Sequence, residues 1–132
     1  MAKHILLIDD EADIREVAGM SLEAIGGWRV SSAACGEEGI AKAIAEKPDV
    51  ILCDVMMPDI DGPATFKRLQ ENPVTQEIPV ILLTARVQRA DRLRFAQLGV
   101  AGVLPKPFDP MALSDQVDAL LATQPAGASE KQ

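Results

Sequence analysis

Short apolar runs alternate with amphipathic segments along this chain. Five of the runs have the length and composition of β-strands, and they are His4–Ile8, Trp28–Ala33, Val50–Asp54, Pro79–Thr84 and Gly102–Pro105. Between and after them, apolar residues recur at intervals of three and four, which is the spacing of one helix face. The alternation predicts a doubly wound α/β domain in which a five-stranded sheet is accompanied by five helices.

The helices are predicted from these apolar stripes and from the residues that bound them. They are expected over residues 14–25, 37–47, 63–71, 87–98 and 110–121. The first stripe comprises Ile14, Val17, Ala18, Leu22 and Ile25.

Three further expectations concern single positions. Asp109 is expected to cap the last helix, with Pro110 at its first position. Trp28 is expected near the surface where the second strand opens, and Phe66 and Leu69 are expected to face inward.

Chemically active side chains stand where the predicted strands end. Asp9 and Asp10 follow the first strand, Asp54 closes the third, Thr84 closes the fourth and Lys106 follows the fifth. In a doubly wound sheet, ligands bind outside the carboxyl ends of the strands. Neighbouring strands lie about 4.8 Å apart, so these side chains are expected to converge on one site.

The loop Asp9–Asp10–Glu11 makes that site acidic. A nucleotide or flavin site would instead carry a glycine-rich turn whose N–H groups face phosphate. Paired carboxylates are favourable when a hard cation neutralises them, and Mg²⁺ prefers oxygen ligands and bridges to phosphate. The loop therefore predicts a magnesium site, with Mn²⁺ as an alternative ion.

Together the strand-end residues have the chemistry of a phosphoryl-transfer site. Asp54 would be the nucleophile and, at an ordinary carboxyl pKa, would be ionised at neutral pH without a general base. The Thr84 hydroxyl and the Lys106 ammonium would stabilise charge on the phosphoryl oxygens.

Four short motifs carry a resemblance to a known family. They are Ile8–Asp9–Asp10–Glu11, Asp54–Val55–Met56–Met57–Pro58 with Asp61–Gly62, Leu83–Thr84–Ala85, and Lys106–Pro107–Phe108. Through their order and spacing, residues 3–122 resemble a response-regulator receiver domain of bacterial two-component signalling. The resemblance implies a flavodoxin-like parallel sheet with strand order 2-1-3-4-5. It also implies a regulatory domain that is not an enzyme with substrate turnover and that catalyses only its own phosphorylation and dephosphorylation.

The resemblance implies a role for each matching residue. Asp54 would be the phospho-acceptor, Thr84 the switch hydroxyl, and Lys106 the partner first of the acceptor and then of the phosphoryl group. The Lys106–Pro107 peptide bond would be cis.

The resemblance also implies a ligand set for Mg²⁺. Asp10 would bind the ion directly and Asp9 largely through water. Asp54 and the backbone carbonyl of Met56 would complete the protein ligands.

One position departs from the family pattern. Three residues before the lysine the family often has Tyr or Phe, whereas this chain has Val103, so the usual aromatic switch is not expected to operate. Arg86 and Met56, each two residues beyond a site residue, are expected to flank the phosphate and to set its lifetime.

Charge and composition narrow the partners. The formal charge of −7 disfavours direct binding of nucleic acid. Arg86, Arg89 and Arg92 are spaced by three, which fits either a solvated helix face or a docking patch. The expected partners are a histidine kinase or histidine phosphotransfer protein and a downstream protein. The downstream protein is expected to bind the face of the fourth helix, fifth strand and fifth helix, with the chain a monomer or a phosphorylation-dependent dimer.

Organisation and compartment follow from what the sequence lacks. Cys35 and Cys53 form no metal or disulfide motif and are interpreted as free packing residues. No leader or membrane-length apolar run is present, so a cytoplasmic protein that does not bind membranes is expected. Residues 1–122 are predicted to form one receiver domain, and residues 123–132 a flexible tail or linker stub.

Two other functions remain as hypotheses. A hydrolase of the haloacid-dehalogenase type shares an Asp nucleophile, Mg²⁺, Thr and Lys, but it needs a second Asp where this chain has Met56. A scaffold that keeps only the fold would not need a complete site.

Overall fold

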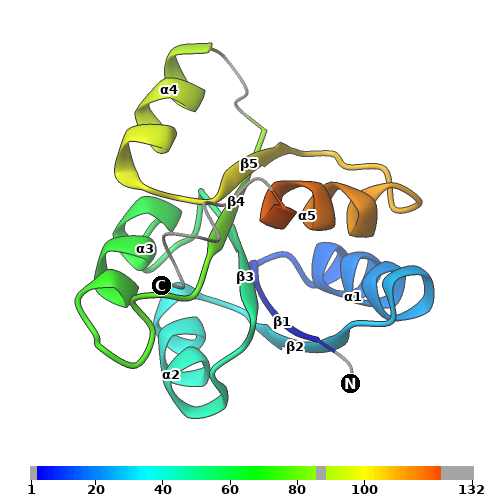
Figure 1. The fold of residues 1–132 in the computed structure, drawn as a ribbon, viewed down its shortest axis with the longest axis horizontal. Helices are drawn as coiled ribbons and strands as arrows, with labels where there is room; N and C mark the ends of the chain where they lie inside the picture. Colours follow the sequence, from blue (N-terminus) through cyan, green and yellow to red (C-terminus); the bar gives the residue numbers. More distant parts are fainter. Residues whose placement is uncertain (1–2, 86–88, 123–132) are drawn as a thin grey trace.

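The computed structural model describes residues 3–85 and 89–122, and it has a parallel sheet between two layers of helices (Figure 1). The strands are β1 (His4–Ile8), β2 (Arg29–Ala33), β3 (Val50–Asp54), β4 (Val80–Thr84) and β5 (Gly102–Pro105). The helices are α1 (Ala12–Gly26), α2 (Gly36–Glu46), α3 (Gly62–Gln70), α4 (Arg89–Leu98) and α5 (Leu113–Ala122). The strand order β2-β1-β3-β4-β5 confirms the predicted fold.

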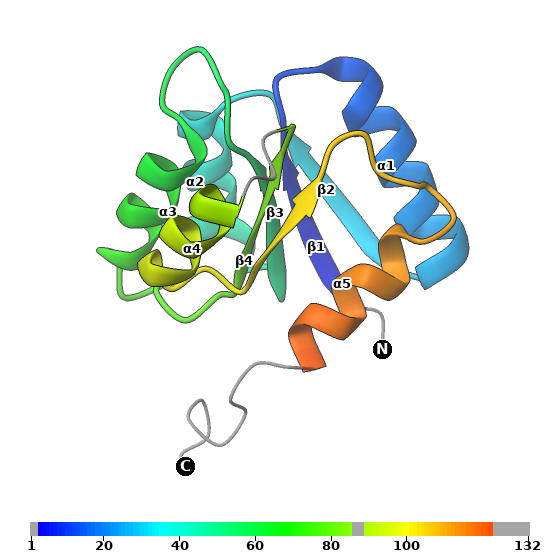
Figure 2. The same ribbon diagram turned by 90° about the horizontal axis from the view of Figure 1, so that it is seen from above.

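The helices cover both faces of the sheet. Figure 2 shows α1 and α5 on one face and α2, α3 and α4 on the other. Side chains of a strand point alternately to the two faces, so Ile5 and Leu7 of β1 pack toward α1 and α5. Leu6 and Ile8 pack toward the other three helices. Burial on both faces explains why β1, β3 and β4 are almost continuous apolar runs.

The buried face of α1 differs from the predicted stripe. Val17 and Ile25 are 44% and 45% exposed, whereas Ala18, Ser21 and Leu22 are buried. Ser21 is tolerated inside because its hydroxyl donates a hydrogen bond to the carbonyl of Pro110, just before α5. The prediction assigned Val17 and Ile25 to the buried face because apolar spacing was its only criterion. Nothing in the spacing indicates that Ser21 is buried with a hydrogen-bond partner.

Trp28 is buried, which corrects the expectation that it lies near the surface. It is 5% exposed within the core between the sheet and α1 and α5, and its indole N–H donates to the Ser114 hydroxyl at 3.3 Å. Gly27 has a φ of 70° and turns the chain at the end of α1, and the Trp28 N–H bonds to the Leu22 carbonyl. Because this turn reverses the chain at the end of α1, the indole of Trp28 packs against the buried side of that helix.

The start of α5 also differs from the prediction. The Asp109 carboxylate accepts a hydrogen bond from the Met111 N–H at 2.9 Å, and the Asp109 carbonyl accepts one from Ala112. These bonds close a separate turn, and the helix begins at Leu113. The inward positions of Phe66 and Leu69 are confirmed.

Three remaining expectations concern the cysteines, membrane-spanning helices and the C-terminal tail. Cys35 and Cys53 are free, and Cys53 lies in the core. Among the described helices, none combines the length and apolar character needed to cross a membrane. The predicted tail, residues 123–132, lies outside the described residues.

Two helical glycines give a test of how closely the helices approach the sheet. A Cβ on Gly39 would lie 2.3 Å from Cδ1 of the buried Ile8, so Gly39→Ala is expected to destabilise the protein by about 1–3 kcal/mol. A Cβ on Gly19 would meet only Val30 at 3.7 Å, and Gly19→Ala is expected to stabilise it by about 0.5–1 kcal/mol. Urea unfolding measures both, and equal effects would show that α2 is not in close contact with β1.

Candidate functional site

The pairing of the strands brings the predicted site residues to one edge. Ile8 pairs with Cys53 and Asp54 with Leu83, so Asp9 and Asp54 lie at the ends of neighbouring strands. Thr84 pairs with Pro105, and the Lys106 N–H donates to the Thr84 carbonyl at 2.9 Å. Lys106 therefore starts at the same edge and its side chain reaches across it.

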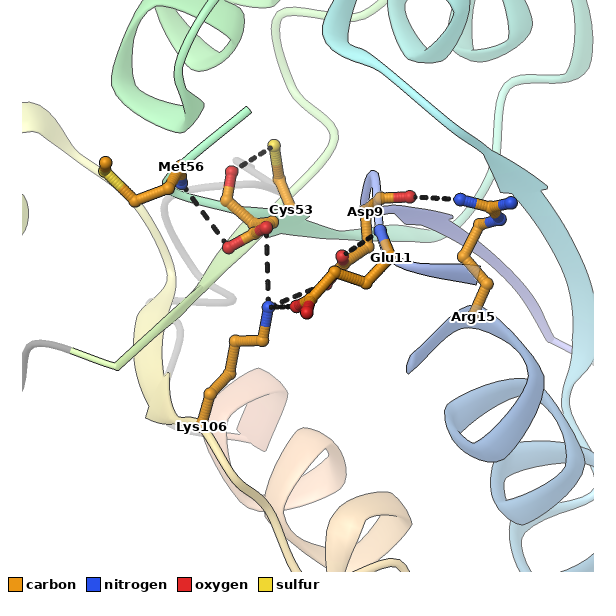
Figure 3. A network of polar contacts seen from close by, with 7 residues as sticks. Asp9, Glu11, Arg15, Cys53, Met56 and Lys106 are labelled. Atoms are coloured by element: carbon orange, nitrogen blue, oxygen red, sulfur yellow. Dashed lines mark hydrogen bonds and ion pairs between the residues drawn. The ribbon is translucent and has the colours of Figure 1, made fainter. Parts of the chain in front are cut away.

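The Lys106 ammonium lies among three carboxylates (Figure 3). Its Nζ is 2.9 Å from Oε1 of Glu11, 3.1 Å from Oδ2 of Asp9 and 3.4 Å from Oδ2 of Asp54. Asp9 and Asp54 are buried, whereas Glu11 is exposed. The lysine is thus the shared counter-ion of groups that come from two different strand ends.

The three carboxylates form a cluster, called here the acidic cluster, of Asp9, Glu11 and Asp54. One oxygen from each lies within 4.8 Å of the others. With one ammonium among them the cluster keeps a formal charge of −2, and its donors are all oxygen atoms. This donor set fits a hard divalent cation such as Mg²⁺.

Glu11 is the member that the sequence analysis placed in the acidic loop but to which it gave no role as a ligand. It follows Asp9 and Asp10 directly, and its own N–H donates to Oδ1 of Asp9 at 2.9 Å. Its position beside the paired aspartates was the available signal. Asp10 is not part of the acidic cluster, but like Glu11 it lines a cavity of about 510 Å³.

That cavity opens over the acidic cluster. Its lining combines Asp10, Glu11, Asp54 and Lys106 with the apolar Ile14, Met56, Ala85 and Pro107. The Met56 N–H is 3.4 Å from Oδ1 of Asp54, and the Met56 side chain is 70% exposed. The Lys106–Pro107 peptide bond is cis.

The structure describes only some of the positions that the sequence analysis expects to take part in switching. Thr84 is buried at the end of β4, and Val103 is half-buried against the core on the α2, α3 and α4 face. Arg86 lies outside the described residues, as do the side chains of Arg89 and Arg92.

Electrostatics change the expected state of Asp54. Burial and the neighbouring Asp9 charge raise the pKa of Asp54 to about 6, although Lys106 opposes the rise. Burial opposes the charge on Lys106, but its hydrogen bonds to Glu11 and Asp9 raise its pKa above the ordinary value. Asp54 is therefore mostly ionised above pH 7 but not at pH 5, whereas an ordinary carboxyl would be ionised at both.

Comparison with known proteins decides the family. Residues 5–118 match the response regulator receiver domain. The chain belongs to this family.

Relatives and solved structures agree with that assignment. The chain is 37% identical over 121 residues to the alkaline phosphatase synthesis transcriptional regulatory protein PhoP of Bacillus subtilis, covering 92% of this chain and 49% of that protein. It is 38% identical over 122 residues to the response regulator PleD of Caulobacter vibrioides, covering 91% of this chain and 26% of that protein. The receiver domain thus spans about half the length of PhoP and about a quarter of PleD.

A solved structure has the same fold. The chemotaxis response regulator CheY4 of Vibrio cholerae matches with a TM-score of 0.85 and 29% identity, covering 91% of this chain and 99% of that chain. Receiver domains are regulatory, accept a phosphoryl group and bind Mg²⁺. They interact with histidine kinases and downstream effectors.

The raised pKa of Asp54 predicts a stability cost of the site in the metal-free receiver domain. Its pKa in the folded chain, about 6, exceeds the ordinary value of 3.8, so ionisation destabilises the fold as pH rises from about 4 through 6. Asp54→Asn is expected to raise the free energy of unfolding by about 1–2 kcal/mol at pH 7.5. The gain should shrink at pH 4.5.

Urea unfolding in the presence of a chelator measures the effect at both pH values. Asp118→Asn, which removes an exposed carboxylate from α5, is the matched control and should show no such pH-dependent gain. A gain for Asp54→Asn that is equal at both pH values would contradict the electrostatic explanation.

Proposed function

We propose that this receiver domain is a phosphorylation-dependent signalling switch in which Asp54 is the phospho-acceptor. An Asp54 oxygen attacks the phosphorus of a phosphohistidine on a histidine kinase or phosphotransfer protein. The new P–O bond replaces the P–N bond, and the imidazole leaves. The observation that supports this best is the position of the Asp54 carboxylate, buried at a strand end and 3.4 Å from the Lys106 ammonium.

The chain's own residues fit the remaining roles. Asp10, Asp54 and the Met56 carbonyl are proposed to hold Mg²⁺, with Asp9 acting largely through water. Glu11 adds negative charge at the rim of the same site. When bound, the ion would neutralise the charge that accumulates on the phosphoryl oxygens.

Lys106 and Thr84 are proposed to respond to the new charge. Lys106 is held by carboxylates before phosphorylation, and the added phosphoryl oxygens compete with them for its three donors. Thr84 lies one residue beyond the partner of Asp54 on β4. A change in these bonds would shift the domain between two conformations with different affinity for a partner.

The output is proposed to pass through α4, β5 and α5 to a downstream protein. With Val103 in place of an aromatic residue, the change at Thr84 and in the following loop would carry the signal without ring rotation. The domain would act as a monomer or as a phosphorylation-dependent dimer, either alone or as part of a longer regulator.

A phosphorylation assay tests the central proposal. Incubation with acetyl phosphate is expected to add the mass of one phosphoryl group when Mg²⁺ is present, and Asp54→Ala should abolish the gain. Intact-mass spectrometry measures this directly. No gain in the wild-type chain would favour the scaffold hypothesis, and turnover of a small phosphomonoester far above stoichiometric would favour the hydrolase.

The lifetime of the phosphoryl group is a separate prediction. Met56 lines the cavity above Asp54, so Met56→Ala is expected to admit water and to speed autodephosphorylation several-fold without preventing phosphorylation. Arg86 variants should also change the rate. Met20→Ala, which truncates another exposed methionine outside the cavity lining, is the control. Wild-type rates in both the Met56 and the Arg86 variants would count against this role.

A further inference from the structure

The loop between β3 and α3 is joined to the start of α2 by Asp59. Oδ1 of Asp59 accepts a hydrogen bond from the Gly36 N–H at 3.1 Å, and Oδ2 accepts one from the Glu37 N–H at 2.8 Å. These N–H groups belong to the first turn of α2, whose own N-cap residue, Cys35, makes no side-chain cap bond. Asp59 therefore caps α2 from a different loop.

The contact is charged and closely fitted. Asp59 is exposed, and slight desolvation opposes its charge, but the N–H groups of Glu37, Ile60 and Gly36 outweigh this effect and lower the pKa of Asp59 to about 2. Ionised acceptors make the stronger hydrogen bonds. A Cβ on Gly36 would lie 2.4 Å from Cγ1 of Ile60, so the glycine permits the loop to lie directly against the helix.

The same loop supplies the backbone beside the phospho-acceptor. Met56 is three residues before Asp59, and its N–H is directed at the Asp54 carboxylate. At the far end of the loop, the Gly62 N–H bonds to the Val55 carbonyl at 2.8 Å and Asp61 caps α3. Asp59 thus fixes the middle of a loop whose two ends are held by β3 and α3.

We propose that Asp59 is a positioning residue that holds the Met56 backbone in place and thereby sets the Mg²⁺ affinity of the site. This inference rests on the proposed function, in which the Met56 carbonyl is a ligand. A loop that is already ordered loses less conformational entropy when the ion binds. Removal of groups that orient metal ligands typically weakens metal binding about 10–100-fold.

Calorimetric titration of the full chain with Mg²⁺ tests the proposal. Asp59→Ala is expected to weaken Mg²⁺ binding about tenfold, and Asp59→Asn less, because the amide keeps one acceptor oxygen. At saturating Mg²⁺ both variants should still gain one phosphoryl group from acetyl phosphate.

Glu37→Gln is the matched control for the loss of charge. It removes a neighbouring carboxylate and its 2.6 Å ion pair with Arg68. It keeps the backbone N–H of residue 37, which donates a hydrogen bond to Asp59. Since exposed ion pairs contribute little, its Mg²⁺ affinity should stay close to that of the wild type. Equal weakening in Glu37→Gln and Asp59→Asn would mean that charge alone acts, and would overturn the proposal.

Hydrogen exchange provides a readout that does not depend on the ion. In the metal-free Asp59 variants, the amides of residues 55–60 are expected to exchange faster than in the wild type. A lower melting temperature with wild-type Mg²⁺ affinity would show that Asp59 is only a helix cap, and would overturn the positioning role. If the wild-type chain neither binds Mg²⁺ nor accepts a phosphoryl group, the proposed function itself is wrong.

Discussion

The structure of the site depends on one electrostatic constraint, which is that like charges share a buried edge of the sheet. Asp9 and Asp54 have little exposed surface at the ends of β1 and β3, and a single ammonium from the end of β5 lies between them. Two carboxylates at this distance raise each other's free energy when ionised. The fold tolerates this arrangement because β1, β3 and β4 are buried on both faces and stabilise it. The acidic edge thus carries unfavourable like charges that a bound cation would offset, and the burial of apolar side chains in the interior compensates for their cost in stability.

The loops that carry the site are held in place by residues from elsewhere in the chain. Arg15 of α1 donates to the Asp9 carbonyl at 2.7 Å, which fixes the turn after β1. Asp59 hydrogen-bonds to the first turn of α2 from the loop after β3. The Arg15 bond is local in sequence, whereas the Asp59 bonds join two segments that only the folded chain brings together. The precision of the site therefore belongs to the α1 and α2 layers as much as to the sheet edge.

The sequence predicted the features that depend on the sheet edge, but not those that depend on contacts between segments distant in sequence. The strands and the convergence of Asp54, Thr84 and Lys106 follow from continuous apolar runs and from the rule that parallel strands end at one edge. The burial of Ser21 could not be predicted, because it depends on a hydrogen bond to the Pro110 carbonyl, which is distant in sequence. The contact of Glu11 with Lys106 was not predicted, because it depends on the direction of the two side chains. Asp59 was missed because its partners lie more than twenty residues away.

The buried Trp28 determines what optical signal this protein offers. The chain has one tryptophan and no tyrosine, so its tryptophan fluorescence comes from a single ring. Trp28 comes directly before Arg29, which pairs with His4 at the amino ends of β1 and β2. The edge that carries Asp54 lies at the carboxyl ends of the strands, about 16 Å away along a five-residue strand. Tryptophan fluorescence will therefore report the packing of α1 and α5 during unfolding. A fluorophore that reports changes at Asp54 would have to be introduced near the carboxyl ends of the strands.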